Sequence, residues 1–120
     1  MLAQTYITGS YQRSTWSGSG YGSDSTAAIF KLSPNPFKSL AGSGPHGDYS
    51  YAIYKGNDYG PTYGGGHDWH VSSNMKTGYL NFGHNYKCRV GNYGQNSCRD
   101  DILGSYSSWS ISEAEMWSEN

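Results

Sequence analysis

The sequence predicts an all-β protein made of two packed antiparallel sheets, a β-sandwich, and three observations support this fold class. Short runs of aromatic and β-branched residues recur along the chain, each about as long as a strand. Clusters of glycine, serine, proline and asparagine separate these runs, as turns separate the strands of antiparallel sheets. Before the last few residues, no segment keeps the apolar spacing of an amphipathic helix.

The predicted strands comprise residues 5–8, 27–32, 49–54, 68–72, 79–82, 103–109 and 111–117. Within 49–54, strand geometry places Tyr49, Tyr51 and Ile53 on one face and Ala52 and Tyr54 on the other. Residues 111–117 alternate in the same way, although so short a segment also fits a short helix that leads into a strand. The prolines and glycines between residues 34 and 47 predict one long loop.

Composition indicates one folded domain over residues 1–120. The hydrophobic fraction is 35% and the mean hydropathy is −0.73, but the chain carries 12 Tyr, 4 Trp and 3 Phe. Because disordered chains are poor in aromatic residues and rich in net charge, this chain is expected to fold around its rings. A net charge of −1 does not suggest a nucleic-acid partner. No apolar run approaches the ~20 residues that span a bilayer, so membrane insertion is not expected.

The two cysteines, Cys88 and Cys98, enclose a loop with glycines that can bring the two sulfurs together. A disulfide here would stabilise the fold by roughly 3 kcal/mol in the loop-entropy description, and it would indicate an extracellular protein. The alternative is two free thiols in a reducing compartment. Two cysteines without an adjacent histidine pair make a poor zinc site. The first four residues do not resemble a signal peptide, so a secretory signal is expected to be either removed or absent.

The most informative segment spans residues 59–71. A turn signal at Gly60 and Pro61 leads into three consecutive glycines at 64–66, and the alternating run 67–71 follows. On a strand, His67 and Trp69 would point to one side while Asp68 and His70 point to the other, so this run by itself is not a zinc motif. The chain has neither a nucleophile elbow nor a phosphate-binding loop, and we expect no enzymatic activity.

This segment resembles the core motif of the TLDc domain family, in the short form found in secreted invertebrate proteins. The resemblance continues through residues 80–86, 102–106 and 111–117, and upstream through 16–21, Asp24 and 28–32. It implies a TLDc-like sandwich that lacks the front part of the full domain. One branch of the family, in sea anemones, includes a calcium-dependent galactose-binding lectin, so the resemblance also implies sugar binding and a role for calcium.

Sugar sites pair an aromatic platform with fixed polar groups, and the predicted loops contain both. The candidate carbohydrate-binding residues are Tyr59, His67, Asp68 and Trp69. The alternative for any single ring is a place in the core. Calcium prefers six to eight oxygen ligands, and the candidate metal ligands are Asp58, Asp68, Asp100 and Asp101, expected in loops. The spacing of these residues is not that of an EF-hand.

The leading prediction is a secreted lectin that binds glycans with terminal galactose or related sugars, uses calcium, and forms homo-oligomers. The alternative is an extracellular structural or adhesive module that self-assembles through exposed aromatic rings and sheet edges. The oxidation-resistance role of intracellular TLDc proteins is a third reading, which a disulfide would disfavour. For the triple glycine, we expect tight packing at Gly64 and approach of Asp68 to a ligand.

Overall fold

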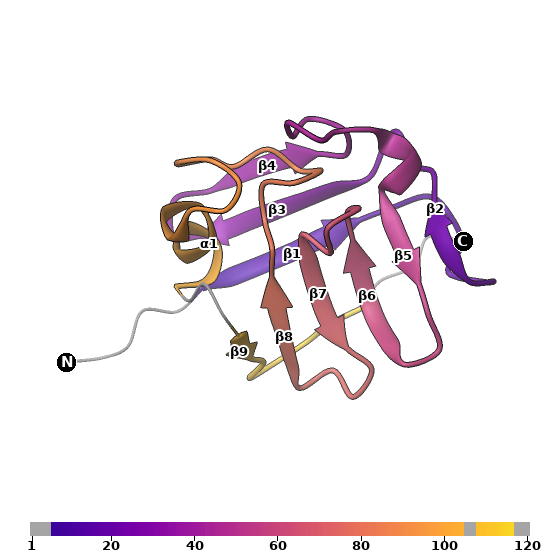
Figure 1. Cartoon of the computed structure of the whole chain (residues 1–120). Helices are drawn as coiled ribbons and strands as arrows, with labels where there is room; N and C mark the ends of the chain where they lie inside the picture. Colours follow the sequence, from indigo (N-terminus) through magenta and orange to yellow (C-terminus); the bar gives the residue numbers. More distant parts are fainter. Residues whose placement is uncertain (1–5, 105–107, 117–120) are drawn as a thin grey trace.

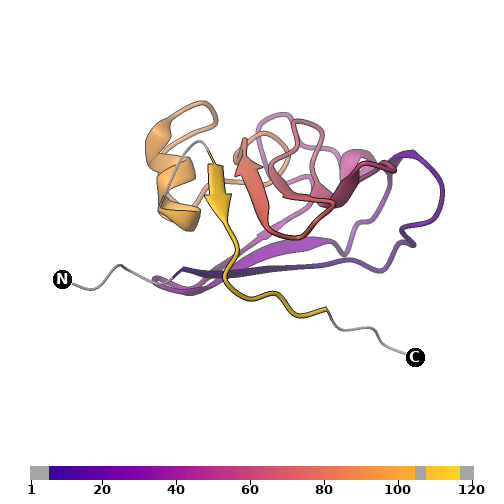
Figure 2. The same cartoon turned by 90° about the horizontal axis from the view of Figure 1, so that it is seen from below.

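The computed structural model describes residues 6–104 and 108–116, and it confirms the predicted all-β sandwich. Two antiparallel sheets lie as separate layers (Figures 1 and 2). One sheet has three strands in the order β1-β3-β4, and the other has six in the order β2-β5-β6-β7-β8-β9. The strands are β1 (Ile7–Tyr11), β2 (Gly20–Gly22), β3 (Ala28–Ser33), β4 (Phe37–Leu40), β5 (Ile53–Lys55), β6 (Tyr59–Tyr63), β7 (Trp69–Ser72), β8 (Thr77–Leu80) and β9 (Ser108–Ser110).

The core fills the space between the two layers. The buried apolar side chains that form it are Ala27, Ile29, Ala52, Ile53, Tyr63, Trp69, Val71, Leu80, Phe82, Tyr86, Cys98 and Ile102. The two buried tyrosines satisfy their hydroxyls inside the protein: Tyr63 donates to the Gln12 side chain at 2.9 Å, and Tyr86 donates to the Ala52 carbonyl at 2.8 Å. Burial raises the pKa of Tyr63 to about 12, so this ring stays neutral and apolar in the core.

The single α-helix of the described residues, α1 (Asn96–Leu103), lies at the end of the molecule away from β2 (Figure 1). Cys98 and Ile102, four residues apart, turn the same face of α1 to the core. Gly104 ends the helix with φ 75°, and its amide donates to the Asp100 carbonyl at 2.8 Å. None of the described helices combines the length and apolar character that a membrane span requires.

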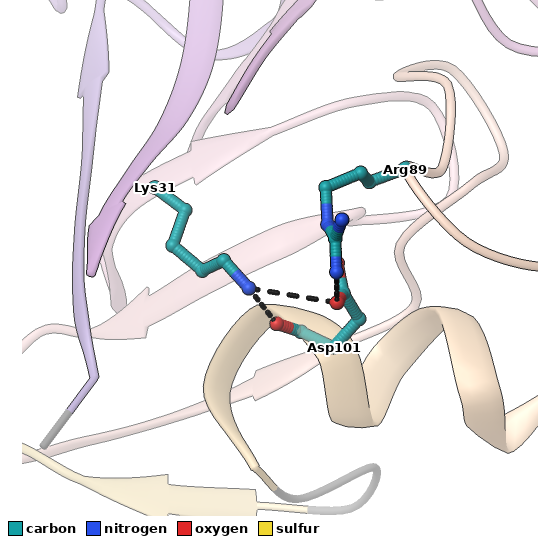
Figure 3. A network of polar contacts seen from close by, with 3 residues as sticks. All are labelled: Lys31, Arg89 and Asp101. Carbon is teal, nitrogen blue, oxygen red and sulfur yellow. Dashed lines mark hydrogen bonds and ion pairs between the residues drawn. The ribbon is translucent and has the colours of Figure 1, made fainter. Parts of the chain in front are cut away.

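The predicted disulfide between Cys88 and Cys98 is confirmed, with the two Cα atoms 5.6 Å apart. A polar network holds the same helix to the three-stranded sheet (Figure 3). Lys31, only 1% exposed, donates to the Asp101 carbonyl and lies 3.6 Å from its carboxylate, which also pairs with Arg89. Burial alone would raise the pKa of Asp101, but Arg89 and Lys31 hold it below its usual value. Helix α1 is therefore fixed by one covalent link and one ionic network.

Several sequence-based boundaries are wrong. Residues 37–40, predicted as loop, form β4, and the predicted turn at Gly60 and Pro61 lies within strand β6. Residues 49–51 form the short 3-10 helix η1 (Tyr49–Tyr51), so Ala52 and Ile53 are both buried and do not alternate. Residues 103–104 continue and cap α1, and 111–116 form no strand. Residue 5, residues 105–107 and residue 117 of the predicted strands lie outside the described residues.

Candidate functional site

One aromatic ring from each of five neighbouring strands lies on the outer face of the six-stranded sheet. These rings, which we call the aromatic row, belong to Tyr21 on β2, Tyr54 on β5, Tyr59 on β6, His70 on β7 and Tyr79 on β8. Strand register builds the row, because Tyr21 is paired directly with Tyr54 and His70 directly with Tyr79. Side chains that alternate with the row point into the core.

The rings follow one another at the spacing of the strands. The centroids are 5.0 Å apart for Tyr21 and Tyr54, 5.2 Å for Tyr54 and Tyr59, 5.0 Å for Tyr59 and His70, and 4.4 Å for His70 and Tyr79. Neighbouring strands in a sheet lie about 4.7–4.9 Å apart, so each strand contributes one step of the row. The planes of successive rings are inclined to one another by 31–74°.

His67 joins the row from the turn between β6 and β7. Its ring lies 4.8 Å from Tyr54 and 5.4 Å from Tyr59, and its Nδ1 is 2.9 Å from the Tyr79 hydroxyl. The sequence predicted that His67 and His70 point to opposite faces, and this is wrong. His67 has φ 55°, which interrupts strand alternation, so both imidazoles lie on the outer face with centroids 6.3 Å apart.

Burial controls the charge of the row. It lowers the pKa of His67 and of His70, so both imidazoles are neutral at pH 7. It also raises the pKa of Tyr21 and Tyr79, which keeps their phenols protonated. The row therefore presents uncharged hydrogen-bonding groups on aromatic rings.

The tautomer of His70 follows from its partner. The Thr62 hydroxyl donates to the Gly60 carbonyl at 3.0 Å, so it accepts from Nδ1 of His70 at 2.8 Å. Nδ1 then carries the proton, and Nε2 keeps its lone pair. Thr62 is fully buried and His70 is 7% exposed, so this pair forms a fixed floor beneath the more exposed tyrosines.

The triple glycine forms the turn that carries His67. Gly64 has φ 93°, and a Cβ there would overlap the Asp68 carboxylate, which confirms the expected tight packing at this position. On one side of the turn the Gly65 carbonyl accepts from the Tyr21 hydroxyl at 3.0 Å. On the other side, a Cβ at Gly66 would lie 3.0 Å from the ring of His84. The turn therefore lies between the side chain of Tyr21 on one side and that of His84 on the other.

Asp68 faces inward and is fully buried. Its Oδ2 accepts from the backbone amides of Asn85 at 2.8 Å and Tyr86 at 2.9 Å. Burial raises the pKa of Asp68 to about 7, although these amide hydrogen bonds act in the opposite direction. The carboxyl thus joins the glycine turn to the 83–86 segment and does not reach the aromatic row, contrary to the expected approach of this side chain to a ligand.

The structure brings together only part of the predicted site. Tyr59, 37% exposed, and His67 lie at the centre of the row, and the exposed Asp58 precedes Tyr59 in the β5–β6 turn. Trp69 is 7% exposed and packs edge-on against Tyr63 in the core, at 5.6 Å. Burial of Asp68 and Trp69 therefore argues against direct contact with a sugar.

The predicted calcium ligands lie on different elements. Asp100 and Asp101 are on helix α1 and not in a loop as expected, and Asp101 is engaged by Lys31 and Arg89. Asp58 lies in the β5–β6 turn and Asp68 lies beneath the glycine turn. Among residues 6–104 and 108–116, no group of three or more histidine, cysteine or acidic side chains is arranged to hold a metal ion. Calcium binding stays a prediction.

Tyr54, His70 and Tyr79 were not among the site residues predicted from the sequence. The available signal was the residue next to each of them: Ile53, Trp69 and Leu80 are core residues, and a strand sends the adjacent side chain to the opposite face. The sequence alone could not show that the five rings of the row lie beside one another across the sheet.

No family model, curated protein or solved structure matches this chain. The resemblance to the TLDc family therefore stays a prediction, and the case for a function rests on the geometry of the aromatic row.

Proposed function

We propose that this protein is an extracellular carbohydrate-binding protein and that the aromatic row is its binding surface. The observation that carries the proposal is the continuous succession of Tyr21, Tyr54, Tyr59, His70 and Tyr79 across five strands of one sheet. Tyr21 and Tyr59 are 41% and 37% exposed, and Tyr51, 46% exposed, packs against Tyr21 at 5.0 Å. Rings of this kind, left at the surface of a small protein, are available to a ligand.

The chemistry of the row suits sugars. A pyranose ring has apolar C–H faces that pack on aromatic rings, and hydroxyl edges that need hydrogen-bonding partners. The row supplies phenol hydroxyls and imidazole nitrogens, and Asp58 and Asn57 supply exposed oxygens next to Tyr59. The pKa shifts of His67 and His70 keep the imidazoles neutral, which suits a neutral glycan. The disulfide between Cys88 and Cys98 is compatible with an oxidising, extracellular environment.

Galactose and calcium remain part of the proposal on the strength of the TLDc resemblance. Asp58 is the predicted metal ligand that lies next to the row, so a calcium ion bound there would sit at the edge of the sugar surface. The contacts of Asp68 and Asp101 with the protein itself make these two carboxylates less available to an ion.

A glycan array probed with the labelled protein, with calcium and with a chelator, tests the proposal. We expect binding to galactose-containing glycans, with Tyr59→Ala weakening it by about tenfold because one stacking surface is lost. Tyr11→Ala is the matched control, since Tyr11 is a similarly exposed tyrosine, at 40%, on the other sheet. Blank arrays in both conditions, with protein shown to be folded, would refute the proposal; equal signals with and without chelator would remove calcium alone.

A second function, self-assembly as an adhesive module, is favoured by the outer face of the three-stranded sheet. Tyr11 and Leu40 lie opposite Ala28 in register, and Leu32 is 58% exposed and Leu40 48%. Exposed aliphatic side chains on a sheet are typical of protein contacts. Light scattering over a range of protein and calcium concentrations tests this candidate. A species that stays monomeric throughout, with Leu32→Ser behaving as the parent protein does, would exclude it.

A further inference from the structure

The aromatic row is long compared with a single sugar. It crosses five strands in four steps, and at the usual strand separation this corresponds to roughly 19 Å. The rings occur at every step, from Tyr21 at the β2 edge to Tyr79 on β8, without an interruption by an aliphatic or charged side chain. A site for one terminal sugar needs one or two rings and a wall of polar groups around them, so a row of this length is more than that ligand requires.

The row is open from β2 to β6, whereas His70 on β7 is only 7% exposed and forms its floor. Tyr21, Tyr51 and Tyr59 are 41%, 46% and 37% exposed, and they are distributed over the β2, η1 and β6 elements. Because the exposed rings are spread over several strands, the contact area that the row offers is elongated in the direction across the sheet. A ligand that uses all of it has to extend over several rings at once.

The charge of the row selects against ionic glycans. No lysine or arginine belongs to it, and the two histidines are neutral at pH 7 for the reasons given above. The carboxylate next to it, Asp58, would repel sulfate and uronate groups and accept hydrogen bonds from hydroxyls. The matching ligand is therefore a neutral polymer of sugars.

We infer that the aromatic row binds an extended, uncharged oligosaccharide or polysaccharide that lies across the strands, with successive sugar units on successive rings. Tyr59 and His67 hold the central unit, and Tyr21 and Tyr51 hold a unit nearer the β2 edge. This inference rests on the proposed carbohydrate binding and adds to it the length of the ligand and its direction on the sheet.

The test is a titration of the protein with neutral oligosaccharides of increasing length. Series of one to six units from β-1,4-galactan, cellulose and chitin are measured by calorimetry. For at least one series we expect the affinity to rise by about tenfold or more from one unit to four and then to level off, because the row has four rings besides the nearly buried His70.

Two variants locate the ligand on the row. Tyr59→Ala should weaken binding at every length, since it removes the central ring. Tyr21→Ala should weaken binding of the four-unit ligand several-fold more than binding of one unit, because it shortens the row at one end. Tyr11→Ala, on the three-stranded sheet, should change neither, and circular dichroism confirms that all three variants are folded.

The possible results separate the two claims. An affinity that is the same for one unit and for six, with loss in Tyr59→Ala, would overturn the extended ligand and leave carbohydrate binding in place. A rise with length that Tyr21→Ala reduces no more than Tyr11→Ala does would also overturn it, since the chain would then lie elsewhere. No binding in any series or on the array, with folded protein, would remove the proposed function itself.

Discussion

The two faces of the six-stranded sheet use aromatic residues in different ways. On the inner face, Tyr63 and Trp69 are 1% and 7% exposed and pack edge-on against each other within the core. On the outer face, Tyr21 and Tyr59 of the aromatic row are 41% and 37% exposed, although His70 in the same row is only 7% exposed. Because alternate residues of a strand point to opposite faces, some of the many aromatic rings of this short chain lie in the core and others lie on the outer face. One set stabilises the fold, and the exposed tyrosines of the other set form the proposed binding surface.

The largest expected effect is on the inner face. Trp69→Ala should lower the free energy of unfolding by about 3–5 kcal/mol, because it leaves a cavity between the sheets. Urea denaturation followed by tyrosine fluorescence measures this. Tyr59→Ala is the outer-face control, with an expected cost of about 1 kcal/mol from lost ring contacts. Similar losses in the two variants would contradict the division of roles between the faces.

The second largest loss of stability is expected when the Asp68 carboxyl is removed. Asp68→Ala leaves the amides of Asn85 and Tyr86 without their acceptor in a buried place, at an expected cost of about 3 kcal/mol. Denaturation gives the stability, and hydrogen exchange should show faster exchange of these two amides. Asp58→Ala, in the exposed β5–β6 turn, should leave both measurements unchanged. Slow exchange at both amides in folded Asp68→Ala would contradict the role given to this carboxyl.

The pH dependence of stability should differ in sign between the two faces. The pKa of Asp68 is raised from 3.8 to about 7, so its contribution is fully present below pH 3.8 and is lost as the pH rises through 7. The lowered pKa of His67 and His70 acts in the opposite sense, because stability is lost as the pH falls below the unfolded value of 6.5.

The difference in unfolding free energy between the parent protein and Asp68→Asn isolates the carboxyl. Between pH 5 and 7 this difference should fall with rising pH, by at most about 1.4 kcal/mol per pH unit. Denaturation at four pH values in that interval measures it. A difference that stays constant with pH would show that Asp68 does not titrate there.

The hydrogen bond between Thr62 and His70 should contribute less to stability than Trp69 or Asp68 does. Thr62→Val keeps the shape of the side chain and removes the acceptor of the His70 Nδ1 proton, at an expected cost of about 1–2 kcal/mol. In NMR spectra the His70 imidazole should lose its fixed tautomer. Thr62→Ser keeps the hydroxyl and is the control, in which His70 should keep its fixed tautomer. A single, unchanged tautomer in Thr62→Val would mean that Thr62 does not orient the ring.

The smallest expected effect is at the edge of the row. Tyr21→Phe removes the hydrogen bond to the Gly65 carbonyl and keeps the ring, so stability should fall by about 0.5 kcal/mol and stacking of a sugar should persist. Thermal melting and the oligosaccharide titration together check this. Tyr51→Phe, whose ring packs on Tyr21, is the matched control. A large loss of binding in Tyr21→Phe would assign the role to the hydroxyl and not to the ring.

Sequence patterns predicted those features that depend on local chemistry. The sandwich follows from short β-type runs between turn residues, and the disulfide follows from two cysteines around a glycine-containing loop. Helix α1 was missed even though Cys98 and Ile102 have helical spacing and Gly104 follows as a C-terminal cap, because eight residues are too few to show a period clearly.

The candidate site was less predictable because it depends on register and on one unusual backbone angle. Tyr59 and His67 were identified from the glycine-rich motif, but the remaining rings come from strands whose alignment no single segment reveals. The φ of 55° at His67 reverses the expected sides of His67 and Asp68, so the carboxyl enters the interior and the imidazole faces out. Adjacent residues of the motif thus lie on opposite sides of the sheet.

The row belongs to a β-sheet, and sheets are twisted. Each strand is rotated by roughly 20–25° relative to its neighbour, so over four steps the direction that the rings face turns by roughly 80–100° about the row. A flat crystalline surface can follow such a line over only two or three rings. A single, soluble glycan chain that winds about its own axis can follow all of it. If the proposed glycan binding holds, the twist of the sheet favours individual hydrated polysaccharide chains over packed fibrils.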